Sequence, residues 1–172
     1  MTTAPAMTGL GRCFFPFLSY RPNLGLNNYT MTKEQLCQEY CLTEKQFFGE
    51  EKYDGPLSLS GLKSIPAGFN PTVGGSLYLR GLKSIPAGFN PTVGGWLELS
   101  GLKSIPAGFN PTVGGWLDLS GLKSIPAGFN PTVGGALNLR GLKSTERSAV
   151  KVNPYTSRLL QGMDVNAPHP LR

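Results

Sequence analysis

The sequence predicts a β-rich solenoid, and three observations support this fold class. Residues 61–140 are four copies of one 20-residue unit. Each copy opens with GLKSIPAGFNPTVGG, and the five residues that follow alternate as x-Leu-x-Leu-x. Partial copies stand on both sides, PLSLS before the first and GLKS after the last. A unit of this length is one structural turn that cannot bury its apolar side alone, so the turns must stack.

Composition and charge limit the class of protein. A chain of 172 residues with 40% hydrophobic residues is typical of one folded domain. The net charge is +6, and the basic excess lies on residues 56–144, which carry seven basic and two acidic side chains. No apolar run approaches the roughly 18 residues of a membrane helix. We therefore expect no membrane span, and the first residues match a signal peptide poorly because they lack its basic region.

The three cysteines, Cys13, Cys37 and Cys41, predict reduced thiols, because an odd number cannot form a complete disulfide framework. We therefore expect a cytoplasmic location, with a secreted effector as the alternative. Cys37 and Cys41 stand one helical turn apart and could contact one metal ion. However, no second ligand pair accompanies them, and the only histidine, His169, is far away in the sequence. Helix packing is the expected role of these two cysteines, with no metal and no cofactor.

Residues 32–55 are predicted to form a helical cap. Thr32 with Gln35, and Thr43 with Gln46, match the capping-box pattern of a threonine at the helix start and a glutamine three residues later. The two patterns predict one helix from position 32 to 40 and a second short helix through position 48. The segments at 1–31 and 145–172 show no clear period, and we expect them to be loosely ordered and irregular, respectively.

The cap is expected to cover the first open turn of the solenoid, because a terminal turn otherwise leaves its core in water. Four apolar side chains are the candidates for this contact: Leu36, Tyr40, Phe47 and Phe48.

Within each turn, the alternating stretch predicts a strand with one buried face, which points Leu77 and Leu79 inward. Prolines and glycines at fixed offsets exclude an ordinary helix elsewhere in the turn. The return path is therefore predicted as turns, a short 3₁₀ segment or extended chain. The expected product is a stack of about four to five turns over residues 56–144 with one parallel strand ladder. Six apolar residues per turn form the expected core: Leu62, Ile65, Phe69, Val73, Leu77 and Leu79.

The motif LxLSGLKSIPAGF resembles the short bacterial type of leucine-rich repeat, and Val-Gly-Gly-x-Leu-x-Leu-Ser-Gly is similar to repeats of bacterial and phage proteins. The resemblance covers Pro56 to Ser144, about half of the chain. It implies a leucine-rich-repeat-like stack that binds a protein or ligand on its strand face. Gly81-Leu82 after the strand and the added Asn70-Pro71 depart from that pattern, and a parallel β-helix is the alternative geometry.

When the turns stack, equivalent residues of adjacent turns lie about 4.8 Å apart and form columns along the solenoid. The asparagines that precede a proline, such as Asn70, are expected either to form an internal ladder or to open turns. One basic column could bind a polyanion, or it could be a solvated edge that keeps the turns soluble. No aromatic residues interleave with it, so nucleic acid is not the expected partner. The basic column consists of Lys63, Lys83, Lys103, Lys123 and Lys143.

The only positions that differ between copies are the outward residues of the strand. In the two middle turns they place Trp96 beside Trp116 and Glu98 beside Asp118. Exposed tryptophans with charged neighbours are typical of binding surfaces. The alternative is drift at positions that the fold does not constrain. The candidate binding residues are Trp96, Trp116, Tyr78, Glu98, Asp118, Asn138, Arg80 and Arg140.

We do not expect an enzyme, because Glu98 and Asp118 would lie on an open face with no pocket to exclude water. The expected function is a monomeric, non-enzymatic module that binds a protein or a carbohydrate on the strand face. Two alternatives are a polyanion-binding surface along the lysine column and a repeat protein without an evolved partner.

Overall fold

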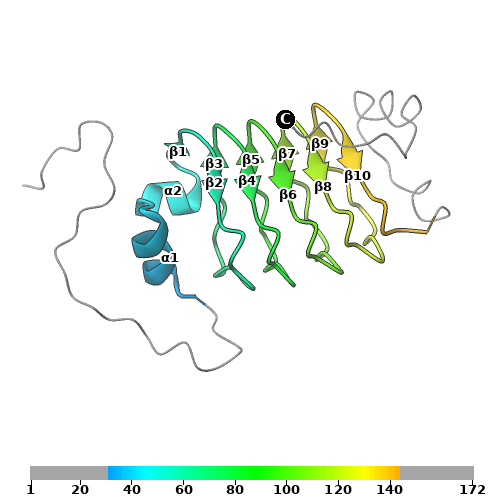
Figure 1. Ribbon diagram of the computed structural model, residues 1–172, viewed down its shortest axis with the longest axis horizontal. Helices are drawn as coiled ribbons and strands as arrows, with labels where there is room; N and C mark the ends of the chain where they lie inside the picture. The colour runs from blue at the N-terminus through cyan, green and yellow to red at the C-terminus, as the bar shows by residue number, and fades with distance from the viewer. Residues whose placement is uncertain (1–30, 144–172) are drawn as a thin grey trace, which may run out of the picture.

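The computed structural model describes residues 31–143, which form a β-solenoid of about four turns with a short helical region at the N-terminal end (Figure 1). The predicted fold class is therefore confirmed. The two terminal segments that were expected to lack regular structure lie almost entirely outside the described residues. Neither helix within the described range is long and apolar enough to cross a membrane.

The helical region consists of α1 (Lys33–Tyr40) and α2 (Glu44–Phe48), and both predicted capping boxes are present. Thr32 Oγ1 accepts a hydrogen bond from Gln35 N at 3.3 Å, and Thr32 N donates to Gln35 Oε1 at 2.9 Å. The corresponding distances between Thr43 and Gln46 are 3.1 and 3.0 Å. These bonds satisfy N–H groups that have no partner within the helix, which fixes where each helix begins.

The cap covers the first turn mainly through Leu36 and Phe47, which are fully buried. The Phe47 ring lies 5.3 Å from the ring of Phe69 in the first turn. Tyr40 is partly buried against the same core. Phe48 is 44% exposed and packs edge-on against Phe47 at 5.0 Å. Its ring also lies beside Gly68 of the first turn, where an added Cβ atom would be 3.4 Å from Phe48 Cε1. Successive helical residues point about 100° apart, so Phe47 enters the core while Phe48 covers the margin of the turn.

The predicted strand ladder is a five-stranded parallel sheet in which each strand pairs with its equivalent twenty residues on. The leucines of each strand point inward, and the residues between them point outward. Its strands are β2 (Leu57–Ser58), β4 (Leu77–Tyr78), β6 (Leu97–Glu98), β8 (Leu117–Asp118) and β10 (Leu137–Asn138).

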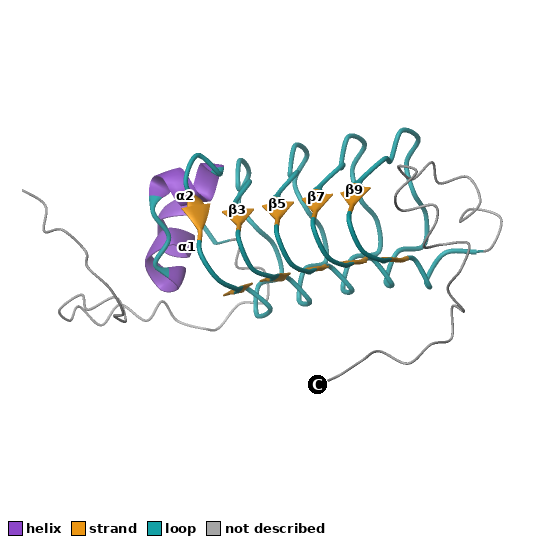
Figure 2. Ribbon diagram, turned by 90° about the horizontal axis from the view of Figure 1, so that it is seen from above, coloured by secondary structure: helices purple, strands orange, loops and turns teal. Residues whose placement is uncertain are grey.

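A second five-stranded parallel sheet was not predicted, since only one ladder was expected. It lies opposite the first, so the solenoid has two rows of short strands (Figure 2). Four of its strands belong to the return path, whereas β1 precedes the first copy and lies within the segment 32–55 that was predicted to be helical. Its strands are β1 (Lys52–Tyr53), β3 (Thr72–Val73), β5 (Thr92–Val93), β7 (Thr112–Val113) and β9 (Thr132–Val133). Each Thr-Val pair buries its valine in the core. Both residues are β-branched, which favours extended backbone.

All six predicted core positions of the first turn are buried. Ile125 in the last turn is the exception among their copies, because it is only partly buried. Phe69, Phe89, Phe109 and Phe129 form the expected spine along the centre. Their rings follow one another at 6.2, 6.1 and 6.3 Å and are inclined by 10°, 8° and 12°. These nearly constant values show that each turn repeats the previous one with almost the same step.

The asparagine column is a hydrogen-bonded ladder at one corner of the solenoid. Asn70 donates through Nδ2 to Gly88 O at 2.8 Å, and its Oδ1 accepts from Asn90 N. Asn90 repeats both bonds one turn further on, and Asn110 accepts from Asn130 N. Of the two expected alternatives the structure has the ladder, but its side chains lie at the surface and are not internal as expected. The first three asparagines of the column therefore each tie their own turn to the next one.

Candidate binding face

The candidate face is the outer side of the sheet formed by the even-numbered strands, here called the strand face. The leucines of the strands are buried, so the residues between and beside them are directed outward. The alternation of inward and outward residues thus places the variable positions of all turns on one surface. All eight predicted binding residues lie on this face, in three adjacent columns that run along the solenoid.

Trp96 and Trp116 stack on each other, with ring centroids 5.6 Å apart and planes inclined by 21°. Trp96 is 37% exposed and Trp116 is half-buried. The predicted proximity of the two tryptophans is therefore confirmed. Stacked rings present a rigid apolar surface with few conformational degrees of freedom.

Glycines determine how the indoles lie, a role that sequence reasoning missed. A Cβ atom on Gly115 would lie 2.8 Å from Trp96 Cδ1, and one on Gly135 would lie 2.8 Å from Trp116 Cδ1. Each indole thus leans over the glycine of the following turn and occupies space that any side chain there would fill. Every unit contains this glycine, so the sequence alone suggests only that it forms a turn. The position of the indoles shows that it also leaves room for a tryptophan of the preceding turn.

Two carboxylates lie in the column next to the tryptophans: Glu98 and Asp118 are paired in register on neighbouring strands. Arg80 Nε donates to Glu98 Oε1 at 2.6 Å, and the Glu98 side chain is only 19% exposed. This hydrogen bond, together with the charge of Glu98, raises the pKa of the Arg80 guanidinium above its ordinary value. The bond joins adjacent turns and compensates the negative charge of Glu98.

Asp118 is held by backbone and side-chain donors. Its Oδ1 accepts from Ser120 N at 2.8 Å and from Asn138 Nδ2 at 3.4 Å. Asn138 Oδ1 in turn accepts from Arg140 N at 3.2 Å. Tyr78 is half-buried and pairs in register with Glu98. Hydrogen bonds within or between turns therefore hold Glu98, Asp118 and Asn138 in place beside the tryptophan pair.

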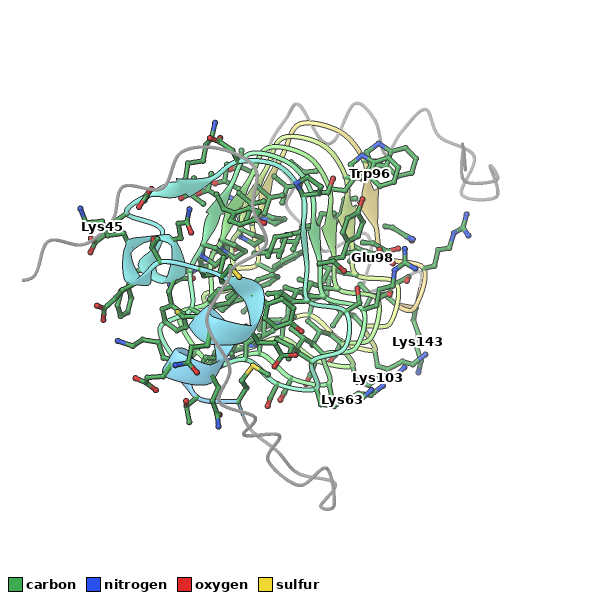
Figure 3. The ribbon with its side chains drawn as sticks, turned by 60° about the vertical axis from the view of Figure 1, so that its left-hand side comes forward. Lys45, Lys63, Trp96, Glu98, Lys103 and Lys143 are labelled. Carbon is green, nitrogen blue, oxygen red and sulfur yellow. The ribbon has the colours of Figure 1, made fainter. Side chains whose placement is uncertain are left out.

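The lysine column lies along a different edge from the tryptophans. Figure 3 shows Lys63, Lys103 and Lys143 in a row, with Trp96 and Glu98 further round the surface. All five lysines of the column are exposed. Within residues 31–143, none of them forms an ion pair.

The cysteine prediction needs a correction. Cys41 is disulfide-bonded, whereas Cys37 is a free, partly buried thiol whose pKa is raised mainly by burial. Three cysteines can form one disulfide and leave one free thiol. The local sequence does not distinguish this arrangement from three reduced thiols. The disulfide removes the Cys41 thiolate, so the two cysteines cannot act together as metal ligands. Within the described part of the chain, no three potential ligands cluster. His169 lies outside that part.

Comparison with known proteins gives no relatives, since no protein-family model, no curated protein and no solved structure matches the chain. The molecule is thus assigned to a fold, a β-solenoid with repeats of ~20 residues, and not to a family. The candidate face must be interpreted from its own geometry.

The tryptophan stack has a spectroscopic consequence, because Trp96 and Trp116 are the only tryptophans of the chain. Two indoles at 5.6 Å couple their electronic transitions, so the circular dichroism spectrum is expected to show an exciton couplet. Trp96→Phe or Trp116→Phe should each abolish the entire couplet. The Phe48→Leu variant, which changes an exposed ring of the cap, should retain it. A spectrum without a couplet, or a couplet that one substitution merely halves, would contradict the stacked arrangement.

Proposed function

We propose that the chain is a non-enzymatic binding module and that the strand face contacts its partner. The observation that carries the proposal is the stacked pair of Trp96 and Trp116 on the one surface where the repeats differ. Large rigid aromatic side chains with polar neighbours are enriched among the residues that dominate binding energies. Trp96 and Phe48 are the exposed large hydrophobic residues of the described region, and only Trp96 belongs to the face.

The hydrogen bonds beside the tryptophans support a preformed contact surface. Arg80 holds Glu98, while Ser120 and Asn138 hold Asp118. A side chain that is already ordered loses less entropy on binding than a mobile one, so such groups favour affinity. The same bonds support a role in binding over one in catalysis, because both carboxylates serve as acceptors within the fold.

The proposed partner is a protein or a carbohydrate. Indole surfaces pack against apolar side chains and against the apolar faces of sugar rings, and hydrogen-bonding groups at Tyr78, Glu98 and Asn138 border them. The x-Leu-x-Leu strand and the Ile-Pro step also support a kinship with short leucine-rich repeats, which we include in the proposal. The disulfide at Cys41 favours the secreted alternative over the cytoplasmic one, since disulfides persist in oxidising compartments.

The test compares the wild-type chain with the double variant Trp96→Ala/Trp116→Ala. A panel of soluble neutral polysaccharides is titrated against each protein by calorimetry, and immobilised proteins are used to capture purified extracellular proteins. The matched control is Phe48→Ala, which removes the other exposed aromatic ring. Loss of a ligand by the double variant, with retention by the control, is the expected result. If the double variant keeps every ligand of the wild type, the strand face is not the binding surface.

A further inference from the structure

The lysine edge, formed by Lys63, Lys83, Lys103, Lys123 and Lys143, is a second surface that the proposed function does not use. Residues 56–143 contain two acidic side chains, Glu98 and Asp118, and both belong to the strand face. Arg80 already pairs with Glu98. The five ammonium groups therefore form a row without counter-charges among the described residues.

The backbone brings the lysines of neighbouring turns side by side. Each lysine follows a leucine whose side chain is buried, such as Leu82 before Lys83, so the lysine is directed outward. Lys83 N donates to Lys63 O, and Lys123 N donates to Lys103 O, both at 3.1 Å. The phenylalanine rings of successive turns are inclined by only 10°, 8° and 12° to one another, so equivalent residues keep similar orientations from turn to turn. The row therefore carries one positive charge per turn.

A serine follows every lysine of the repeat, as in Lys83-Ser84 and Lys103-Ser104. Ser84, Ser104 and Ser124 are exposed. Each turn therefore offers one cation and one hydroxyl group at the same edge. A ligand that matches this pattern carries one negative charge and neighbouring hydroxyl groups in each of its own repeating units.

We infer that the lysine edge binds a linear acidic polysaccharide with one carboxylate on each sugar ring. Such a polymer offers one carboxylate per sugar ring and the edge offers one lysine per turn, so several carboxylates along the polymer can pair with lysines of the row. Nucleic acid fits less well. Each strand of a duplex carries one phosphate per about 3.4 Å of helix axis, and single strands are held by stacking on aromatic side chains, which this edge lacks.

The attraction of the row to such a polymer is electrostatic. Binding should release counterions, so the affinity must decrease as the salt concentration rises. The five lysines gather on one edge, so the local charge density there exceeds the average over the chain. The affinity is therefore expected to depend on these lysines more than on the net charge of the chain.

The experiment titrates polygalacturonate into the full chain by calorimetry at low salt and with increasing sodium chloride. The test variant is Lys83→Gln/Lys103→Gln. The control is Lys45→Gln/Lys52→Gln, which removes the same charge from exposed lysines of the cap. Figure 3 shows Lys45 on the opposite side of the molecule from the row. Lys52 pairs with an exposed Asp54 at 3.0 Å, and exposed pairs contribute little stability.

The wild type is expected to bind, with an affinity that falls as salt is added. The row variant should lose affinity on the order of tenfold at low salt, whereas the cap variant should stay within about twofold of the wild type. Equal losses of affinity in both variants would show that only the net charge of the chain matters, which would overturn the inference. Absence of binding by the wild type at low salt would overturn it as well. Tighter binding of single-stranded DNA than of polygalacturonate would overturn the ligand class.

Binding of the polysaccharide at the lysine edge does not involve the strand face. Trp96→Ala/Trp116→Ala should bind polygalacturonate as the wild type does, so failure of one proposal leaves the other intact. If the tryptophan variant loses this ligand while the row variant keeps it, the polysaccharide binds on the strand face and the lysine edge is not its site.

Discussion

Replacing Phe89 by alanine is expected to lower the free energy of unfolding by about 3–5 kcal/mol. Phe89 is 1% exposed and stacks between Phe69 at 6.2 Å and Phe109 at 6.1 Å. Its removal opens a cavity in the centre of the stack and weakens the interfaces with both neighbouring turns. Because each turn of a solenoid contacts only its neighbours, no other part of the molecule can compensate.

Equilibrium unfolding in urea measures this effect. The control is Phe48→Ala, since Phe48 is 44% exposed and packs edge-on against Phe47 without entering the stack of phenylalanine rings. This variant should lose about 1 kcal/mol or less. Similar losses for the two variants would show that the phenylalanine spine does not hold the turns together. A partial transition of Phe89→Ala at low urea would indicate that the stack separates into two halves at the missing ring.

The second large effect is expected for Gly101→Ala, which should cost about 1–3 kcal/mol. Gly101 begins the third copy and packs against the backbone of the turn before it. A Cβ atom there would overlap Arg80 O and lie 2.6 Å from Leu82 O. These are backbone atoms that cannot rotate away, so the two turns would have to separate locally. Adjacent hydrogen bonds of the sheet, such as Leu79 N to Glu98 O at 2.9 Å, would be strained.

The matched control is Gly61→Ala, which changes the same position of the first copy. A Cβ atom on Gly61 would meet nothing within 4 Å, because no complete turn precedes it. Its stability should change by no more than about 0.5 kcal/mol, and a smaller unfolded-state entropy could even make the change favourable. Thermal unfolding of the two variants compares them directly. Equal destabilisation would mean that the glycine is needed for the backbone conformation and not for the close approach of turns.

Much of the candidate face follows from the sequence, because the period puts equivalent residues beside each other. That rule alone brings Trp96 next to Trp116 and Glu98 next to Asp118. It does not specify the direction of a side chain within its column. The bond from Arg80 to Glu98 runs between columns as well as between turns, and the lean of Trp96 over Gly115 depends on its rotamer. Such details emerge only once the side chains have packed.

The sequence by itself determined the solenoid, its inward leucines and the start of both helices. These properties depend on local rules: a fixed period, alternation of apolar residues, and a threonine with a glutamine three residues on. Tertiary structure alone decided the second ladder, because a strand of two residues such as Thr72–Val73 exists only through its pairing with the neighbouring turns. It likewise decided which ring of the cap, Phe47 or Phe48, continues the spine. Both outcomes depend on contacts between residues that lie about one repeat apart, and those contacts form only when the turns stack.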